Sequence, residues 1–147
     1  VFRNPSMKRE EAKTLFFAWL YNQDSKDLND SYYDREKILD KWYDGEYITT
    51  VFGRNIKVND WKALNYLIQS TTADLVIERA IAIDKFLEDK RSFISHIVHD
   101  EVVVDFADED RNLVKEIKDI FADNKLAKYE VNLNAGKNYF DLDTLRL

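Results

Sequence analysis

The sequence predicts an α+β fold in which antiparallel hairpins pack against helices, one of them long. Segments with apolar residues at helical spacing are separated by stretches rich in β-branched and aromatic residues. Turn residues interrupt these stretches, which is typical of antiparallel pairing between neighbouring strands. With 147 residues, of which 45% are hydrophobic, the chain can bury a sizeable core.

Two helices and a hairpin are expected in the first part of the chain. The Asn-Pro pair at 4–5 predicts the start of a helix over 6–21, because asparagine caps helices and proline fits their first turn. A shorter helix is expected over 34–42. The β-rich stretch 46–58, interrupted at Gly53, predicts a hairpin.

A long helix of about 60–90 is predicted next, with Asn59 or Asp60 as its cap. Its apolar residues recur at helical spacing and should face the core. These residues are Leu64, Ile68, Leu75, Ile83 and Leu87.

A second hairpin, 93–106, is formed by the stretches "FISHIV" and "EVVVDF", joined at His99 and Asp100. Asp108 is predicted to cap a further helix with one apolar stripe. The stripe consists of Leu113, Val114, Ile117, Ile120 and Phe121. The segment 129–134, "YEVNLN", is expected to be a last strand before an aromatic tail.

Composition limits the chemistry that the chain can perform. It has no cysteine, which excludes disulfides and thiolate metal sites, so any ligands must be oxygen or imidazole. A net charge of −6 disfavours indiscriminate coating of nucleic acid but allows a local basic patch. No apolar run approaches the roughly 20 residues of a spanning helix, so we expect a soluble, cytoplasmic protein with no membrane partner. The start at Val1 suggests a piece of a longer chain.

Arg9, Lys13, Phe17 and Tyr21 stand four residues apart and share one face of the first predicted helix. Two cations followed by two aromatic rings match a nucleotide, because Arg and Lys bind phosphate oxygens and aromatic rings pack against bases. The alternative is a solvated edge whose aromatic residues belong to the core. The neighbouring apolar residues lie largely off this face and could anchor the helix.

Two further groups of polar residues have both a structural and a functional interpretation. Asn65 and Gln69, four apart on the long helix, are either exposed amides or contacts to base edges and sugars. His99, Asp100 and Glu101 form either a solvated hairpin tip or a metal site.

Together these motifs resemble a known family. "REEAKTLFFAWLY", "ALNYLIQSTTAD" and "VHDE" are similar, in this order, to the fingers-helix motif, the palm helix and the metal-binding hairpin of family A DNA polymerases, the bacterial DNA polymerase I-like class. The bacteriophage members resemble the chain most, and the closing "NAGKNYFDL" is similar to their C-terminal end. The resemblance implies a DNA-directed DNA polymerase acting in DNA replication, in the host cytoplasm if a phage encodes it. It also implies fingers-type helices over 1–45 and a palm portion over 46–147.

On the fingers helix, the resemblance implies that Arg9 and Lys13 hold the triphosphate of an incoming deoxynucleotide. Phe17 would pack against its sugar and base, and Tyr21 would lie where the templating base enters.

On the palm portion, the resemblance implies that Asn65 and Gln69 contact primer-template DNA and that His99 lies against the primer terminus. Asp100 would bind the catalytic Mg²⁺ ions, with Glu101 in support.

The chain departs from the family in one decisive respect. The upstream Asp-x-Ser-x-x-Glu motif, which supplies the second carboxylate of the two-metal site, is absent. We therefore expect a C-terminal catalytic portion that is inactive alone and needs the remainder of the polymerase, in the same longer chain or as a separate subunit. Asn22 and Trp61 replace an expected glycine and an expected basic residue. The alternatives are a non-catalytic module that binds DNA or nucleotide, and an unrelated domain with accidental matches.

Overall fold

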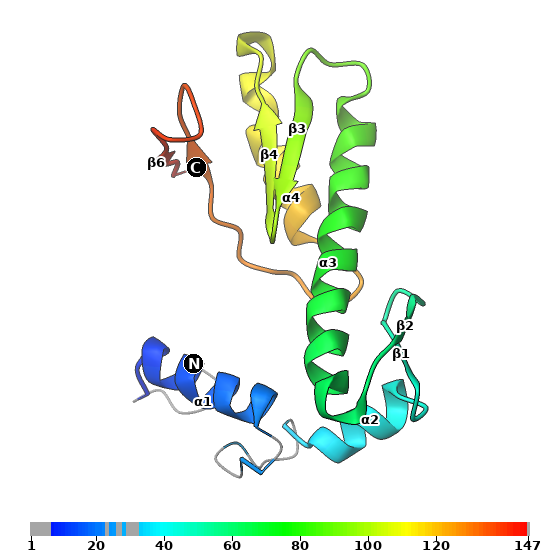
Figure 1. Cartoon of the computed structure of the whole chain (residues 1–147). Coiled ribbons are helices and arrows are strands. Elements are labelled where there is room, and N and C mark those ends of the chain that lie inside the picture. Colours follow the sequence, from blue (N-terminus) through cyan, green and yellow to red (C-terminus); the bar gives the residue numbers. More distant parts are fainter. Residues whose placement is uncertain (1–6, 23, 26–27, 29–32, 147) are drawn as a thin grey trace. The chain divides into compact units, whose positions relative to one another are not determined.

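The computed structural model describes residues 7–22, 24–25, 28 and 33–146 (Figure 1). The elements are α1 (Arg9–Tyr21), α2 (Arg35–Trp42), β1 (Tyr47–Thr49), β2 (Asn55–Lys57), α3 (Asp60–Leu87), β3 (Phe93–Val98), β4 (Glu101–Asp105), the 3₁₀-helix η1 (Asp108–Leu113), α4 (Val114–Ala122), β5 (Asn134–Ala135) and β6 (Asp143–Thr144). The pairs β1–β2, β3–β4 and β5–β6 each form a two-stranded antiparallel sheet. The predicted α+β class and the long helix are confirmed, whereas the predicted cap at Asn4 and Pro5 lies outside the described residues.

The chain packs as two units, Val1–Thr71 and Thr72–Leu147, with the boundary inside α3. This division is based on which residues pack together. The predicted division into fingers-type residues 1–45 and palm residues 46–147 is based on the family resemblance and stays a prediction.

In the first unit, α1 is anchored by one face. Trp19 and Leu20 are 4% exposed and pack with the fully buried Leu64 of α3. The indole Nε1 of Trp19 donates to the carbonyl oxygen of Tyr33 at 2.7 Å. The guanidinium of Arg35 donates to the carbonyl oxygens of Trp19 and Leu20, which lie in the last turn of α1. These contacts satisfy groups that a helix end leaves unpaired, and they fix which face of α1 is buried.

The β1–β2 hairpin joins α2 to α3 through a second small core. Its members are Ile48, Val58, Ala63 and Leu67. Asp34 caps α2, since its side chain accepts from the Lys37 amide at 3.0 Å. The Tyr43 hydroxyl contacts Asp60 Oδ1 at 2.5 Å, and this hydrogen bond raises the pKa of Tyr43 to about 12. The phenol therefore stays protonated and connects the end of α2 to the start of α3.

In the second unit, the β3–β4 hairpin and α4 pack against α3 (Figure 1). Ile83, Leu87 and Ile117 are almost fully buried. The hairpin contributes Ile94, Val102 and Val104 to this cluster. The predicted apolar face of the long helix is thus confirmed at Ile83 and Leu87. The apolar side chains of the hairpin pack against this face and hold the hairpin in place.

Two local predictions are wrong. Asp108 begins η1 and does not cap α4; the residue before η1 is Ala107, and no side chain caps that end. The segment 129–134 is a strand only at its last residue, because β5 begins at Asn134, which pairs with Thr144 of β6. Strand propensity is insufficient where pairing is missing.

Asp110 fastens η1 to the start of β3. Its Oδ2 accepts from the amides of Ser92 and Arg91 at 2.8 and 3.0 Å and from the Ser92 hydroxyl at 2.8 Å. The Ser92 hydroxyl oxygen in turn accepts from the Ala107 amide at 3.0 Å. The bonds from Ser92, followed by that from Arg91, hold the pKa of Asp110 below its ordinary value of 3.8.

Asp110→Asn should lower the stability of the second unit in a pH-dependent way. A carboxylate with a lowered folded-state pKa stabilises the fold at pH above the unfolded value and loses that contribution as the pH falls through the folded value. The variant should therefore be less stable than the wild type at pH 7, with a difference that shrinks below pH ~4. Urea unfolding at pH 7 and pH 3 measures this. The exposed Asp119→Asn is the control and should show little difference at either pH.

Candidate nucleotide-binding and metal-binding sites

The four predicted nucleotide-binding residues share the exposed side of α1. Phe17 and Tyr21 are 44% and 58% exposed, although their neighbours Trp19 and Leu20 are buried. The Phe17 and Tyr21 rings lie 6.1 Å apart with an interplanar angle of 30°. An aromatic surface of this kind can stack on a base. The alternative that the two rings belong to the core is wrong.

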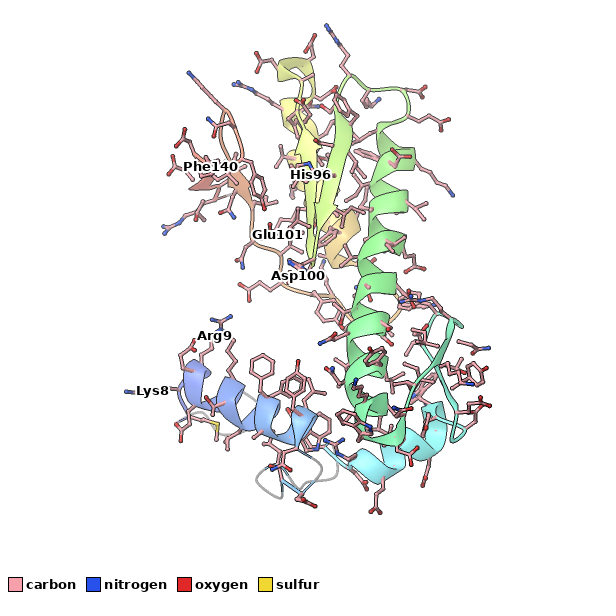
Figure 2. The ribbon with its side chains drawn as sticks, in the orientation of Figure 1. Lys8, Arg9, His96, Asp100, Glu101 and Phe140 are labelled. Atoms are coloured by element: carbon pink, nitrogen blue, oxygen red, sulfur yellow. The ribbon has the colours of Figure 1, made fainter. Side chains whose placement is uncertain are left out.

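The cationic end of this face is open to solvent. Lys13 is exposed, and the Arg9 side chain is 82% exposed, with its guanidinium 3.7 Å from the carboxylate of Glu10. Figure 2 labels Arg9 and Lys8 at the start of α1. Exposed pairs of this kind contribute little energy, so Arg9 can exchange Glu10 for a phosphate at small cost.

One contact joins two of the predicted motifs. Gln69 Nε2 of α3 donates to the Tyr21 hydroxyl of α1 at 3.4 Å, across 48 residues of sequence. Asn65, one turn earlier on α3, has a buried Oδ1 without a hydrogen-bond partner among the described residues. A buried acceptor without a partner costs free energy.

The β3–β4 hairpin ends in a two-residue turn, as predicted. Val98 pairs with Glu101, so only His99 and Asp100 form the tip. His99 has φ +54°, a left-handed conformation that histidine adopts more readily than most residues. His99, Asp100 and Glu101 are exposed, and the tip presents them above the apolar base formed with α3.

Two residues beside the tip were not predicted. The Tyr139 hydroxyl donates to Glu101 Oε2 at 3.2 Å, and this hydrogen bond raises the pKa of Tyr139. The ring of Tyr139 also lies 5.7 Å from that of His96. The aromatic tail was visible in the sequence, but no spacing rule connects it to Glu101, which lies 38 residues earlier.

The carboxylates of the tip match the chemistry of a hard divalent cation, because Mg²⁺ prefers carboxylate oxygen. Their number is too small for two ions. Among the residues that the structure describes, no group of three or more His, Asp or Glu side chains is placed to hold a metal. Asp100 and Glu101 by themselves therefore do not make up a complete ligand set for a metal ion.

The predicted site residues fall into two groups. The first unit contains Arg9, Lys13, Phe17, Tyr21, Asn65 and Gln69, and the second contains His99, Asp100 and Glu101. Within the first unit the structure brings Tyr21 to Gln69, and within the second the three tip residues are consecutive.

Trp61, at the position where the resemblance leads one to expect a basic residue, is 61% exposed. The ammonium group of Lys62 lies 4.6 Å from the centre of its ring, so a cation is present at this end of α3 after all.

No helix in the described part of the chain is long and apolar enough to cross a membrane. Comparison with protein-family models, curated protein sequences and solved structures finds no match to this chain.

Proposed function

We propose that this chain is the fingers-helix and palm portion of a family A DNA polymerase of bacteriophage type. It takes part in template-directed nucleotidyl transfer on primer-template DNA, with deoxynucleoside triphosphates as substrates. Alone it is inactive, since the second metal-binding carboxylate belongs to the remainder of the polymerase.

The contact between Tyr21 and Gln69 is the observation that supports this proposal most. Two motifs identified separately in the sequence meet at 3.4 Å, with the aromatic end of the α1 face beside the amides of α3. A nucleotide whose base packs on Phe17 would then lie near side chains able to contact the template and primer. If the motif matches were accidental, there would be no reason to expect Tyr21 of one motif to contact Gln69 of the other.

In the proposed reaction the primer 3′-hydroxyl loses its proton to solvent and its oxygen bonds to the α-phosphorus. The bond from that phosphorus to the bridging oxygen breaks, which releases pyrophosphate. Arg9 and Lys13 bind the phosphates that leave and neutralise their growing charge. Phe17 and Tyr21 orient the base, and His99 contacts the primer terminus.

Mg²⁺, held by Asp100 with Glu101 in support and by a carboxylate of the remaining polymerase, would supply charge stabilisation at the attacking and leaving oxygens. The chain's own part is to hold Asp100 on a rigid hairpin. The Val98–Glu101 pairing and the apolar base of the hairpin provide that rigidity.

A non-catalytic module that binds DNA or nucleotide is the second candidate. It is favoured by the absence of a complete metal-binding group among the described residues. Primer extension in the presence of Mg²⁺ distinguishes the two, with Asp100→Asn as the decisive variant.

Arg9→Ala and Lys13→Ala should each weaken binding of a fluorescent dATP analogue to the 147-residue chain about tenfold. A charge-assisted hydrogen bond to phosphate contributes about 1.5–3 kcal/mol, and 1.4 kcal/mol corresponds to a factor of ten. Fluorescence anisotropy measures the affinity.

Lys8→Ala is the matched control, because Lys8 is an exposed cation next to Arg9 but outside the stripe. Its affinity should change less than about twofold, since a cation outside the site acts only through a screened field. Equal losses in all three variants would indicate a diffuse charge effect and would count against a nucleotide site on α1.

A further inference from the structure

The C-terminal segment has a defined conformation that its own residues dictate. β5 and β6 pair through Asn134 with Thr144 and Ala135 with Asp143. At Gly136 a Cβ atom would lie 1.8 Å from the carbonyl oxygen of Asp141, so this close backbone approach requires glycine.

Asn138 fixes the turn between β5 and β6. Its Oδ1 accepts from the amides of Phe140 and Asp141 at 2.9 and 3.0 Å, and its Nδ2 donates to Asp141 Oδ2 at 3.0 Å. Such turns present successive side chains in different directions. Phe140, labelled in Figure 2, is 98% exposed, whereas its neighbour Tyr139 contacts the β3–β4 hairpin.

A bulge in β3 creates the surface that Tyr139 contacts. Ile94 pairs with Val104 on the side that faces the core, and the register then shifts before His96 pairs with Val103. Without that shift, His96 would face the same way as Ile94, because side chains two residues apart share a face of a strand. The bulge turns His96 outward, to the side where Glu101 also meets Tyr139.

We infer that Tyr139 positions Glu101 beside Asp100, so that the β5–β6 segment forms part of the candidate metal-binding site. The hydroxyl holds Oε2 of Glu101 at 3.2 Å, and the other carboxylate oxygen, Oε1, does not take part in this bond. The ring is held in turn against His96 at 5.7 Å. This inference rests on the proposed function, since it concerns the carboxylate that supports Asp100 there.

Pre-organisation explains how Tyr139 would act on metal binding. A flexible exposed glutamate loses rotamer freedom when it is ordered beside an ion, and a hydrogen bond already made in the free protein removes part of that cost. Tyr139→Phe, which removes only the hydroxyl, should therefore weaken Mn²⁺ binding to the full 147-residue chain about threefold, because a single hydrogen bond makes a modest net contribution.

The test is a titration of each variant with Mn²⁺, in which free Mn²⁺ is measured by electron paramagnetic resonance. Tyr129→Phe is the matched control, because Tyr129 lies in the same unit and is 47% exposed, compared with 49% for Tyr139. It should bind as the wild type does, while Asp100→Asn should abolish binding at the same concentrations.

A second readout follows the contact itself. In chains with ¹³Cζ-labelled tyrosine, Glu101→Gln should change the ¹³Cζ chemical shift of Tyr139 at neutral pH, because the charged partner of its hydroxyl is removed. No change would show that the contact is not made in solution and would overturn the inference.

The outcomes separate the inference from the proposed function. Loss of binding in Asp100→Asn with unchanged binding in Tyr139→Phe overturns the inference and leaves the metal site standing. Tighter Mn²⁺ binding by Tyr139→Phe also overturns the inference, since the hydrogen bond from Tyr139 would then keep the Glu101 carboxylate away from the ion. Equal Mn²⁺ binding by the wild type and Asp100→Asn counts against the metal site of the proposed function. Tyr139 would then have no positioning role at that site either.

Discussion

Asp100→Asn is expected to abolish Mg²⁺-dependent primer extension, with a loss of roughly 10³-fold or more, in line with removal of a principal charge-stabilising group. An asparagine keeps the shape of the side chain but lacks the charge that holds a divalent cation. The tip itself should be preserved, because His99 carries the left-handed conformation and Val98 pairs with Glu101. The loss is therefore expected in kcat more than in the KM for nucleotide.

The assay needs a catalytically complete protein. The 147-residue chain should be joined to, or mixed with, an upstream segment that carries the missing Asp-x-Ser-x-x-Glu motif. Extension should appear only when this segment is present. Asp105→Asn is the control, since Asp105 is an exposed carboxylate at the opposite end of the same hairpin.

Two results would require revision. Extension by the 147-residue chain alone, with loss in Asp100→Asn, would mean that another acid of this chain completes the site. Primer-template binding that is equal with and without Mg²⁺, together with no extension from any combination, would favour the non-catalytic module.

Ile83→Ala is expected to have the largest effect on stability, a loss of about 2–5 kcal/mol. Ile83 is 1% exposed and lies between α4 and the base of the β3–β4 hairpin. Its truncation removes apolar burial and leaves a cavity that the surrounding helices can fill only in part. Urea unfolding followed by far-ultraviolet circular dichroism measures the change.

Ile81→Ala is the matched control on the same helix. Ile81 is 51% exposed, so the substitution should change the free energy of unfolding by less than about 0.5 kcal/mol. Tryptophan fluorescence follows the unfolding of the first unit separately, because all three tryptophans lie in that unit. They are Trp19, Trp42 and Trp61. Similar losses for Ile81 and Ile83 would contradict the packing described here.

Much of the local structure could be predicted from the sequence. The Asn-Pro pair at 4–5 indicated the helix over 6–21 that contains α1, and apolar residues at helical spacing indicated α3. The turn at His99 and Asp100 followed from the two β-rich stretches beside it. These features depend on interactions between residues that are close in the sequence, so they can be predicted from the sequence alone.

The errors arose where a local signal competes with distant partners. Asp108 looked like a helix cap, but the acidic side chain that matters is Asp110, whose partners Arg91 and Ser92 lie 19 and 18 residues earlier. The segment 129–134 has the composition of a strand, but of its residues only Asn134 belongs to a strand, where it pairs with Thr144. Amino-acid composition indicates that a segment favours the strand conformation, but a strand forms only where a second segment is available to pair with it.

The candidate site shows the same division. The sequence by itself determined which residue types stand at which spacing on α1, on α3 and at the hairpin tip. Only the tertiary structure decided that Phe17 is exposed while Trp19 is buried, that Gln69 meets Tyr21, and that Tyr139 meets Glu101. Exposure and contacts between residues 38 and 48 positions apart depend on how complete elements pack, and that packing is a property of the folded chain as a whole.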